Sequence, residues 1–253
     1  MDYTLKEMMT IIAAREIRND DIVFCGTGIS MLAAMAAKNI NAPESVIFFE
    51  TGALDSRLEE LPLAVGDSRV MYKTSANGGL LDSFAAMQNP VTGRHVIGIL
   101  GAAQIDKFGN LNSTVIGDYH SPEIRFSGSG GGCDVASFVP RSIIFMQHEK
   151  RKFVNRLDYL TSPGYIDGKG GRKKAGLPDG GPIMVITNLA VMRFDEATKE
   201  MYLSGVYPGI TPERVLMNME IEVDISRVKE EIPPSEKELR LLREKCDHQR
   251  LIL

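Results

Sequence analysis

The sequence feature that most constrains the fold is an apolar run that ends in a carboxylate and a glycine. Residues 46–49 are all apolar, and they lead directly into Glu50 and, two residues later, Gly52. A continuous apolar run of this kind is typical of a strand that is buried on both faces of a sheet. Gly52 allows a sharp turn where the strand ends. We therefore expect Glu50 at or near the carboxyl edge of a central strand, where open α/β sheets bind their ligands.

A helix connects this strand to an earlier one. Residues 22–25 form a short apolar run that ends in a Gly-Thr-Gly turn at residues 26–28. Residues 29–38, which are rich in Ala and Met, follow this turn and are expected to form a buried helix. The order of strand, glycine turn, helix and strand predicts a βαβ unit with a parallel sheet.

The rest of the chain continues this alternation of apolar runs and turn signals. No internal repeat and no Pro- or Ser-rich linker divides the 253 residues. We therefore expect one α/β domain over residues 1–253, with an open, mostly parallel sheet and flanking helices. Further strands are expected at residues 70–72, 95–100, 142–146, 183–186 and 201–206, and helices at residues 4–17 and 80–87, after Thr211 and after Ser235.

A long polar, glycine-rich stretch lies in the middle of the chain, at residues 106–134. Apolar residues occur throughout it, so we expect short strands and ordered loops rather than a disordered linker. Its last part, residues 128–134, contains successive glycines whose backbone N–H groups can converge on an anion. The same composition also fits a flexible tight turn. Residues 161–181 are interpreted as a surface excursion, and the basic runs at 150–152 and 172–174 as solvated faces.

Composition excludes several classes of function. The net charge of −4 argues against a nucleic-acid or anionic-membrane partner. No apolar run reaches the roughly 20 residues that span a bilayer, and the first residues do not resemble a signal peptide. The three cysteines are far apart and the four histidines lack metal-ligand spacing, so we expect a cytoplasmic protein without a metal site.

Glu50 has several alternative interpretations. By itself it is most often a solvated strand-end charge or the partner of an arginine. The Gly-Thr-Gly turn followed by Glu50 has the layout of a dinucleotide site, but Met31 occupies the third glycine position. A serine-hydrolase elbow is excluded because Ser127, not glycine, lies two residues before Ser129. A carboxylate can also be a nucleophile, provided that the acyl donor is activated, as in a thioester, and the site is dry.

Several longer phrases of the sequence carry a resemblance to a known family. Over residues 4–226 the chain resembles the B subunits of family I CoA-transferases of the glutaconate type. Glu50, in a Glu-x-Gly motif, matches the nucleophilic glutamate of that family. The phrases that carry the resemblance are residues 26–28, 49–52, 104–106, 109–114, 116–120, 146–151 and 161–164.

The resemblance also implies a set of binding residues. The glycine-rich loop looks like the second glycine motif of the family, with Gly132 in place of the usual alanine, which is expected to loosen the loop. CoA or acyl-CoA is then the substrate, and no permanently bound cofactor is expected. The residues expected to bind CoA or the reacting oxyanion are Gly26, Thr27, Gly28, Gly52, Gly128, Gly130, Gly131 and Asp134.

The chemistry implied by the resemblance is ping-pong transfer of CoA from an acyl-CoA, such as acetyl-CoA, to a dicarboxylate such as glutaconate. Glu50 would become a glutamyl-CoA thioester during turnover. A separate A subunit is implied, in an A2B2 or larger assembly, with the active site at the boundary of the two subunits. The alternatives are an acyl-CoA hydrolase or decarboxylase in which Glu50 is a general base, and a non-catalytic partner that completes the site of an A subunit.

Overall fold

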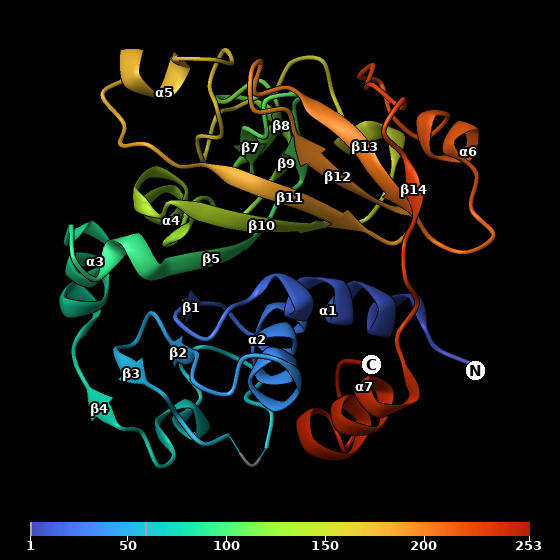
Figure 1. The fold of residues 1–253 in the computed structure, drawn as a ribbon. Coiled ribbons are helices and arrows are strands. Elements are labelled where there is room, and N and C mark those ends of the chain that lie inside the picture. Colours follow the sequence, from blue (N-terminus) through green and yellow to red (C-terminus); the bar gives the residue numbers. More distant parts are fainter. Residues whose placement is uncertain (1, 59) are drawn as a thin grey trace. The chain divides into compact units, whose positions relative to one another are not determined.

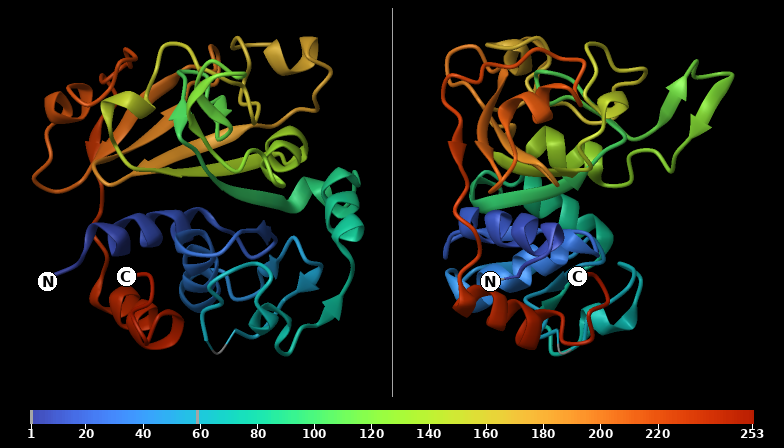
Figure 2. Two further views of the ribbon diagram at one scale, coloured as in Figure 1. Left: turned by 180° about the vertical axis from the view of Figure 1, so that it is seen from behind. Right: turned by 90° about the vertical axis from the view of Figure 1, so that its right-hand side faces the viewer.

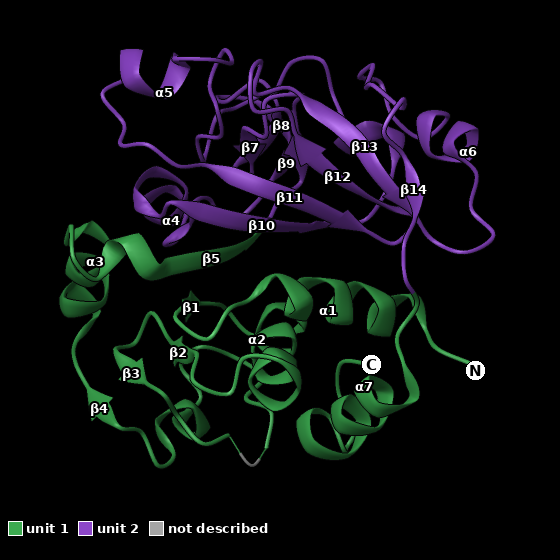
Figure 3. Cartoon of the chain, in the orientation of Figure 1, with its two compact units in different colours: residues 1–100, 233–253 green, residues 101–232 purple. Residues whose placement is uncertain are grey.

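The computed structural model describes residues 2–58 and 60–253, which form two compact units (Figures 1 and 3). Unit 1 consists of Met1–Leu100 and Pro233–Leu253, and unit 2 of Gly101–Ile232. The expected open, mostly parallel sheet with flanking helices is confirmed, although antiparallel strands make it mixed. The expectation of one domain over residues 1–253 stays a prediction, and each unit is described by itself.

Unit 1 has strands in the order β5-β1-β2-β3-β4. The first three are parallel, and β3 and β4 are antiparallel to their neighbours. The expected βαβ unit is therefore confirmed. The elements of unit 1 are α1 (Leu5–Glu16), β1 (Ile22–Phe24), α2 (Ile29–Ile40), β2 (Val46–Phe48), β3 (Ala53–Leu54), η1 (Ser68–Met71), β4 (Ala76–Asn77), α3 (Leu80–Gln88), η2 (Gly93–His95), β5 (Val96–Gly101), α7 (Glu236–Leu241) and the π-helical turn η4 (Leu242–Cys246).

Local sequence signals account for the helices of unit 1. Thr4 and Glu7 form a capping box that begins α1, as the spacing predicts. Residues 31–37 of α2 are buried without interruption, because this helix is apolar on all sides. The C-terminal helix α7 begins with a second capping box, between Ser235 and Glu238.

A bidentate ion pair connects α7 to α1. The guanidinium of Arg15 donates two hydrogen bonds of 2.8 Å to the carboxylate of Glu238. Partial burial raises the pKa of Glu238, but the hydrogen bonds from Arg15 and Ser235 outweigh it and lower that pKa to about 2.

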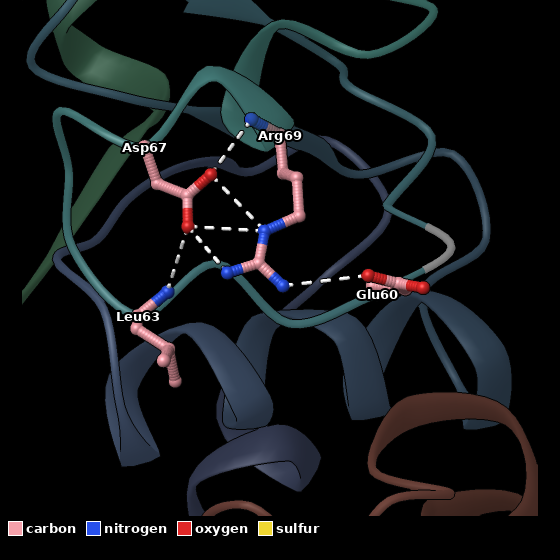
Figure 4. A network of polar contacts seen from close by, with 4 residues as sticks. All are labelled: Glu60, Leu63, Asp67 and Arg69. Atoms are coloured by element: carbon pink, nitrogen blue, oxygen red, sulfur yellow. Dashed lines mark hydrogen bonds and ion pairs between the residues drawn. The ribbon is translucent and has the colours of Figure 1, made fainter.

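The strand expected at residues 70–72 is wrong, because a polar cap holds these residues in a 3-10 helix, η1. The carboxylate of Asp67 accepts a hydrogen bond from the Arg69 backbone N–H, at 3.0 Å, and further bonds from the Arg69 guanidinium (Figure 4). The hydrogen bonds from Arg69 hold the pKa of Asp67 well below its usual range. This local competition outweighs the β propensity of three apolar residues.

Unit 2 has strands in the order β14-β13-β12-β11-β10 and two separate ribbons, β6–β7 and β8–β9. Strands β10 and β11 are parallel, as are β13 and β14, whereas β12 is antiparallel to both neighbours. β12 was not expected from the sequence. The elements are β6 (Gln104–Ile105), β7 (Leu111–Asn112), β8 (Val115–Gly117), β9 (Pro122–Arg125), α4 (Gly132–Phe138), β10 (Arg141–Met146), η3 (Lys150–Lys152), α5 (Gly171–Lys174), β11 (Pro182–Thr187), β12 (Ala190–Phe194), β13 (Met201–Val206), α6 (Pro212–Leu216) and β14 (Lys229–Glu230).

The glycine-rich stretch at 106–134 is ordered, as expected, and buried asparagines hold it. The side-chain oxygen of Asn110 accepts hydrogen bonds from the backbone N–H groups of Gly164, at 2.8 Å, and Ile166, at 3.1 Å. Its amide nitrogen donates to Asp106 and to the Ile166 carbonyl, both at 2.8 Å. Asn110 therefore adds side-chain hydrogen bonds to the backbone pairing of these two segments, in which Leu111 and Ser162 form an antiparallel bridge.

The interpretation of residues 172–174 as a solvated face is wrong for Arg172, and residues 161–181 are not simply a surface excursion. The Arg172 side chain is buried, and burial lowers the pKa of its guanidinium. It donates hydrogen bonds to four carbonyls, those of Ala136, Ser137, Gly164 and Pro178, at 2.7–3.1 Å. Two of these carbonyls lie in the last turn of α4, where a cation is favourable.

We predict that Arg172→Met lowers the free energy of unfolding of the protein by about 3 kcal/mol or more, because four carbonyls, three of them in buried residues, lose their donor. Lys173→Met, at the adjacent exposed position, is the matched control and is expected to change the free energy by less than about 0.5 kcal/mol. Urea denaturation followed by circular dichroism measures both. Equal stability of the two variants would contradict the role assigned to Arg172.

We also predict that stability declines as the pH falls from about 4.5 towards 2, because Glu238 has a pKa of about 2 when folded and an ordinary value of 4.5. Its ionised form stabilises the fold above pH 4.5, and protonation removes that contribution. Glu238→Gln retains a capping-box residue but not the charge. It should lower the free energy of unfolding by about 1–2 kcal/mol at pH 7 and by much less near pH 2.

Glu236→Gln is the control for this experiment, since Glu236 is an exposed acid in the same first turn of α7. Denaturation at a series of pH values measures the two variants against the unmodified chain. The same pH dependence in both variants would show that the Arg15–Glu238 pair is not responsible.

Candidate functional site

Glu50 lies in a tight turn immediately after β2. The backbone N–H of Gly52 donates to the carbonyl of Phe49 at 2.9 Å, which leaves Glu50 and Thr51 as the two central residues of a β-turn. The chain then returns antiparallel as β3, with the Phe49 N–H donating to the Ala53 carbonyl at 3.0 Å. The sequence correctly predicts that Glu50 lies at the end of the strand. It does not predict that Glu50 lies in the turn of a hairpin between β2 and β3. We call residues 49–52 the Glu50 turn.

Gly52 is required in this turn for two reasons. Its φ is +95°, a conformation that only glycine adopts without strain. A β-carbon at Gly52 would also lie 2.1 Å from the carbonyl oxygen of Gly78. The two backbones approach so closely because the Gly78 N–H donates to the Gly52 carbonyl at 2.8 Å. The Glu-x-Gly motif therefore reflects the packing of one backbone against another.

Helix α3 supports the same turn from a second side. The buried hydroxyl of Ser83 donates to the Phe49 carbonyl at 3.3 Å. Gly78 and Ser83 were not recognised as site residues in the sequence. The Asn-Gly-Gly triplet at 77–79 signals a loop but not the close approach to Gly52, and a single serine in a helix carries no signal at all.

The side chain of Glu50 is partly exposed, and no described residue pairs with its carboxylate. Among residues 2–58 and 60–253, no hydrogen bond or ion pair to it is found. The next side chain differs in burial, because the Thr51 hydroxyl is the one buried side-chain N or O atom of the same residues that has no hydrogen-bond partner. Pairing with an arginine, one of the two structural roles expected for Glu50, is therefore not found among these residues. Glu50 is instead held by its backbone and left free at its side chain.

The Gly-Thr-Gly turn lies beside the Glu50 turn within unit 1. Strands β1 and β2 are parallel and in register, with Phe24 opposite Phe48, so residues 26–28 and Glu50 follow the ends of neighbouring strands. Gly28 has a φ of +79° and begins α2 without a side-chain cap. The free N–H groups at this helix terminus favour a negative charge. Unit 1 thus brings together Gly26, Thr27, Gly28, Glu50 and Gly52.

The cysteine before this turn is not an alternative nucleophile. Cys25 is buried, and burial raises the pKa of its thiol to about 12. It therefore remains protonated near neutral pH. His148 is likewise structural, because its ring is buried and its two nitrogens contact the Thr187 hydroxyl at 3.2 Å and the Val215 carbonyl at 3.1 Å.

The glycine-rich loop belongs to unit 2. Gly128 and Gly130 have positive φ angles of +91° and +50°, while a β-carbon at either position would meet no atom within 4 Å. Glycine is therefore needed for the backbone conformation and not for lack of space. Gly131 is the N-cap of α4, and Asp134 lies in its first turn, where an acid is favourable.

The loop is anchored at both ends by hydrogen bonds. The Gly128 N–H donates to the Ser113 carbonyl at 3.1 Å, and the Ser113 hydroxyl donates back to the Gly128 carbonyl at 3.1 Å. At the other end, the Ser129 hydroxyl accepts from the Cys133 N–H at 2.9 Å. Unit 2 thus brings together Gly128, Gly130, Gly131 and Asp134, whereas Glu50 and the Gly-Thr-Gly turn lie in unit 1.

Two further searches cover the part of the chain that the structure describes. Residues 2–58 and 60–253 contain no group of three or more His, Cys, Asp or Glu side chains placed to hold a metal ion. None of the helices in these residues has the length and apolar character needed to cross a bilayer.

Comparison with known proteins gives a consistent result. Residues 6–218 match the coenzyme A transferase family. The chain is 43% identical to the B subunit of glutaconate CoA-transferase from Acidaminococcus fermentans, covering 97% of this chain and 93% of that protein. It is 36% identical to the B subunit of 3-oxoadipate CoA-transferase from Pseudomonas knackmussii, covering 95% and 92%.

A solved structure agrees with these sequence relatives. The crystal structure of glutaconate CoA-transferase from Acidaminococcus fermentans superimposes with a TM-score of 0.95 at 41% identity, covering 99% of this chain and 97% of that one. The match to the family extends over the Gly-Thr-Gly turn, the Glu50 turn and the glycine-rich loop. The chain therefore belongs to the coenzyme A transferase family.

Proposed function

We propose that this chain is the B-type subunit of a CoA-transferase, that Glu50 is its nucleophile, and that it acts with a separate A subunit on a dicarboxylic acyl-CoA such as glutaconyl-CoA. The observation that carries the proposal is the Glu50 turn: a rigid backbone presents a carboxylate that no described residue pairs with. The similarity to the B subunits of glutaconate and 3-oxoadipate CoA-transferases supports the substrate class.

The first half of the reaction moves CoA from the donor onto Glu50 by way of an anhydride. A carboxylate oxygen of Glu50 attacks the thioester carbonyl of the donor, the C–S bond breaks, and CoA leaves as a thiolate. The product is an acyl-glutamyl anhydride. The thiolate then attacks the glutamyl carbonyl of this anhydride, whose bridging C–O bond breaks. The donor acid leaves as a carboxylate, and Glu50 carries CoA as a thioester.

The second half repeats these two steps in reverse with the acceptor. Its carboxylate attacks the glutamyl-CoA thioester and displaces CoA thiolate, which then attacks the acceptor side of the new anhydride. Acyl-CoA is released, and Glu50 is regenerated as a carboxylate. The exchange is close to neutral in energy because one thioester and one carboxylate replace another.

The surroundings of Glu50 suit this sequence. None of the residues that the structure describes forms an ion pair with the carboxylate, so its lone pairs are available for attack. The turn is held by Gly78 and Ser83, which limits the motion of the nucleophile relative to the sheet. Each tetrahedral intermediate needs donors for its oxyanion, and one such donor is worth roughly 3 kcal/mol. The free N–H groups at the start of α2 are proposed donors, and the glycine-rich loop is a proposed binding element for CoA.

We predict that Glu50→Gln abolishes exchange of labelled carboxylic acid with acyl-CoA, with a loss of at least about 1,000-fold, because an amide cannot form the anhydride. Glu44→Gln, at an exposed position before the same strand, is the control and should retain full exchange. The assay uses the chain together with its A subunit. The unmodified pair should also gain the mass of CoA at Glu50 when acyl-CoA is added alone.

Two results would overturn this mechanism. Normal exchange by Glu50→Gln would exclude Glu50 as the nucleophile. Loss of thioester without any acceptor acid, with no CoA adduct on Glu50, would instead indicate a hydrolase in which Glu50 activates water.

We further predict that Gly52→Ala removes activity and stability together. The substitution places a side chain at a φ of +95° and within 2.1 Å of the Gly78 carbonyl, so the turn must shift. The strain alone costs roughly 1–2 kcal/mol, and displacement of Glu50 should reduce exchange by more than tenfold. Gly66→Ala, where a β-carbon meets no atom within 4 Å, is the matched control. Full exchange by Gly52→Ala would show that the turn geometry is not needed.

A further inference from the structure

Strands β8 and β9 form a ribbon that projects from the rest of unit 2, as the right-hand view of Figure 2 shows. We call residues 115–125 the β8–β9 arm. Its two strands pair with each other and form a sheet of their own. An isolated two-stranded ribbon is marginally stable in water and normally packs against something else. The arm therefore suggests a surface that is completed by a partner.

A cleft of about 1010 Å³ lies under one face of the arm. Ile116 and Ile124 are opposite each other across the two strands, and both line the cleft together with Phe126. Ile124 is 44% exposed and Phe126 37% exposed. The opposite wall contains further apolar residues, Ala102, Ala103 and Val154.

The charges of the cleft argue against a phosphate or nucleotide as its occupant. A phosphate site has an excess of positive charge, but this cleft has equal numbers of acidic and basic side chains. Two of the basic groups are already paired, since Glu149 lies 2.7 Å from the Arg151 guanidinium and 3.4 Å from Lys152 Nζ. The charged lining residues are Arg151, Lys152, Arg156, Glu123, Asp158 and Glu220.

The lining of the cleft combines apolar side chains with balanced charges, and protein–protein interfaces likewise combine apolar and polar surface. Exposed aromatic and arginine side chains on the arm add to this. The ring of Tyr119, which is 48% exposed, stacks on Tyr159 with 5.3 Å between centroids, and the Arg125 guanidinium lies 4.7 Å from the Tyr119 ring centre. Tyrosine and arginine are enriched among the few residues that dominate the binding energy of protein interfaces.

The arm is continuous with the glycine-rich loop. Its base is closed by the hydrogen bond from the Phe126 N–H to the Thr114 carbonyl, at 3.0 Å, and the next bonds along the chain join Ser113 to Gly128. A polypeptide seated in the cleft would therefore contact the segment that leads into the proposed CoA-binding loop. This continuity favours the subunit that shares the reaction over an unrelated protein or a second copy of this chain.

We propose that the cleft under the β8–β9 arm receives a segment of the A-type subunit, and that docking there holds the start of the glycine-rich loop in place. The inference rests on the proposed function in one respect, the existence of an A subunit. It assigns no catalytic role to the arm itself.

The test measures pairing separately from chemistry. Ile124→Lys places a charge on the apolar wall of the cleft and should weaken binding of the A subunit at least tenfold, in line with the loss of one buried apolar side chain. Ile225→Lys, at an isoleucine of unit 2 that is 38% exposed and does not line the cleft, is the matched control and should bind normally. Biolayer interferometry with immobilised A subunit gives the dissociation constants, and the Tm of each variant confirms that it is folded.

A second measurement needs no substitution. Hydrogen exchange of the unmodified chain should slow at residues 115–125 and 151–158 when the A subunit is added, and not at residues 225–232. Ile124→Ala, a milder change, should weaken binding less than Ile124→Lys and replaces it if the latter is unstable.

Three results would overturn the proposal. These are normal binding by folded Ile124→Lys, unchanged hydrogen exchange in the arm on pairing, and a dimer of this chain alone that Ile124→Lys dissociates, which would identify a second copy as the occupant. Glu50→Gln should pair like the unmodified chain. Suppose that Ile124→Lys fails to bind the A subunit, while Glu50→Gln still exchanges labelled carboxylic acid with acyl-CoA at the normal rate. This result would overturn the catalytic proposal for Glu50 and support the docking proposal for the arm.

Discussion

The contact between the backbones of Gly52 and Gly78 is the constraint on which the arrangement of unit 1 around Glu50 depends. It permits a hydrogen bond of 2.8 Å between two loops and leaves no room for a side chain on Gly52. The turn that carries Glu50 is thereby joined to the start of α3, and Ser83 adds a second bond to the same turn. Backbone contacts thus fix the position of Glu50 and leave its carboxylate free to react.

Unit 2 achieves rigidity by another route, because buried polar side chains join its long loops to each other and to α4. Asn110 pairs with the backbone of residues 164–166, and Arg172 satisfies carbonyls of both this segment and α4. Buried polar groups are costly unless they have partners, and here Asn110 makes four side-chain hydrogen bonds and Arg172 donates four. The glycine-rich loop, which must present its backbone to a ligand, is therefore flanked by rigid structure on the C-terminal side of α4.

The two proposals use these features for different purposes. In the proposed chemistry, an activated thioester compensates for the weak nucleophilicity of a carboxylate, and a dry site is required. Glu50 is partly exposed in this chain, and in the proposed function the A subunit supplies the remaining cover. The apolar wall of the β8–β9 arm, with its balanced rim of charges, has the character of a surface for such a partner.

Much of this protein was determined by the sequence alone. Capping boxes at Thr4 and Ser235, the apolar run before Glu50 and the order of strand, helix and strand correctly predicted most elements and the family, because these signals are local or lie in contiguous motifs. Tertiary structure alone decided the strand β12, the burial of Arg172, the close approach of Gly78 to Gly52 and the projection of the β8–β9 arm. Each of these features depends on contacts between segments that are far apart in the chain. Such contacts produce no local motif or periodic pattern from which the sequence could predict them.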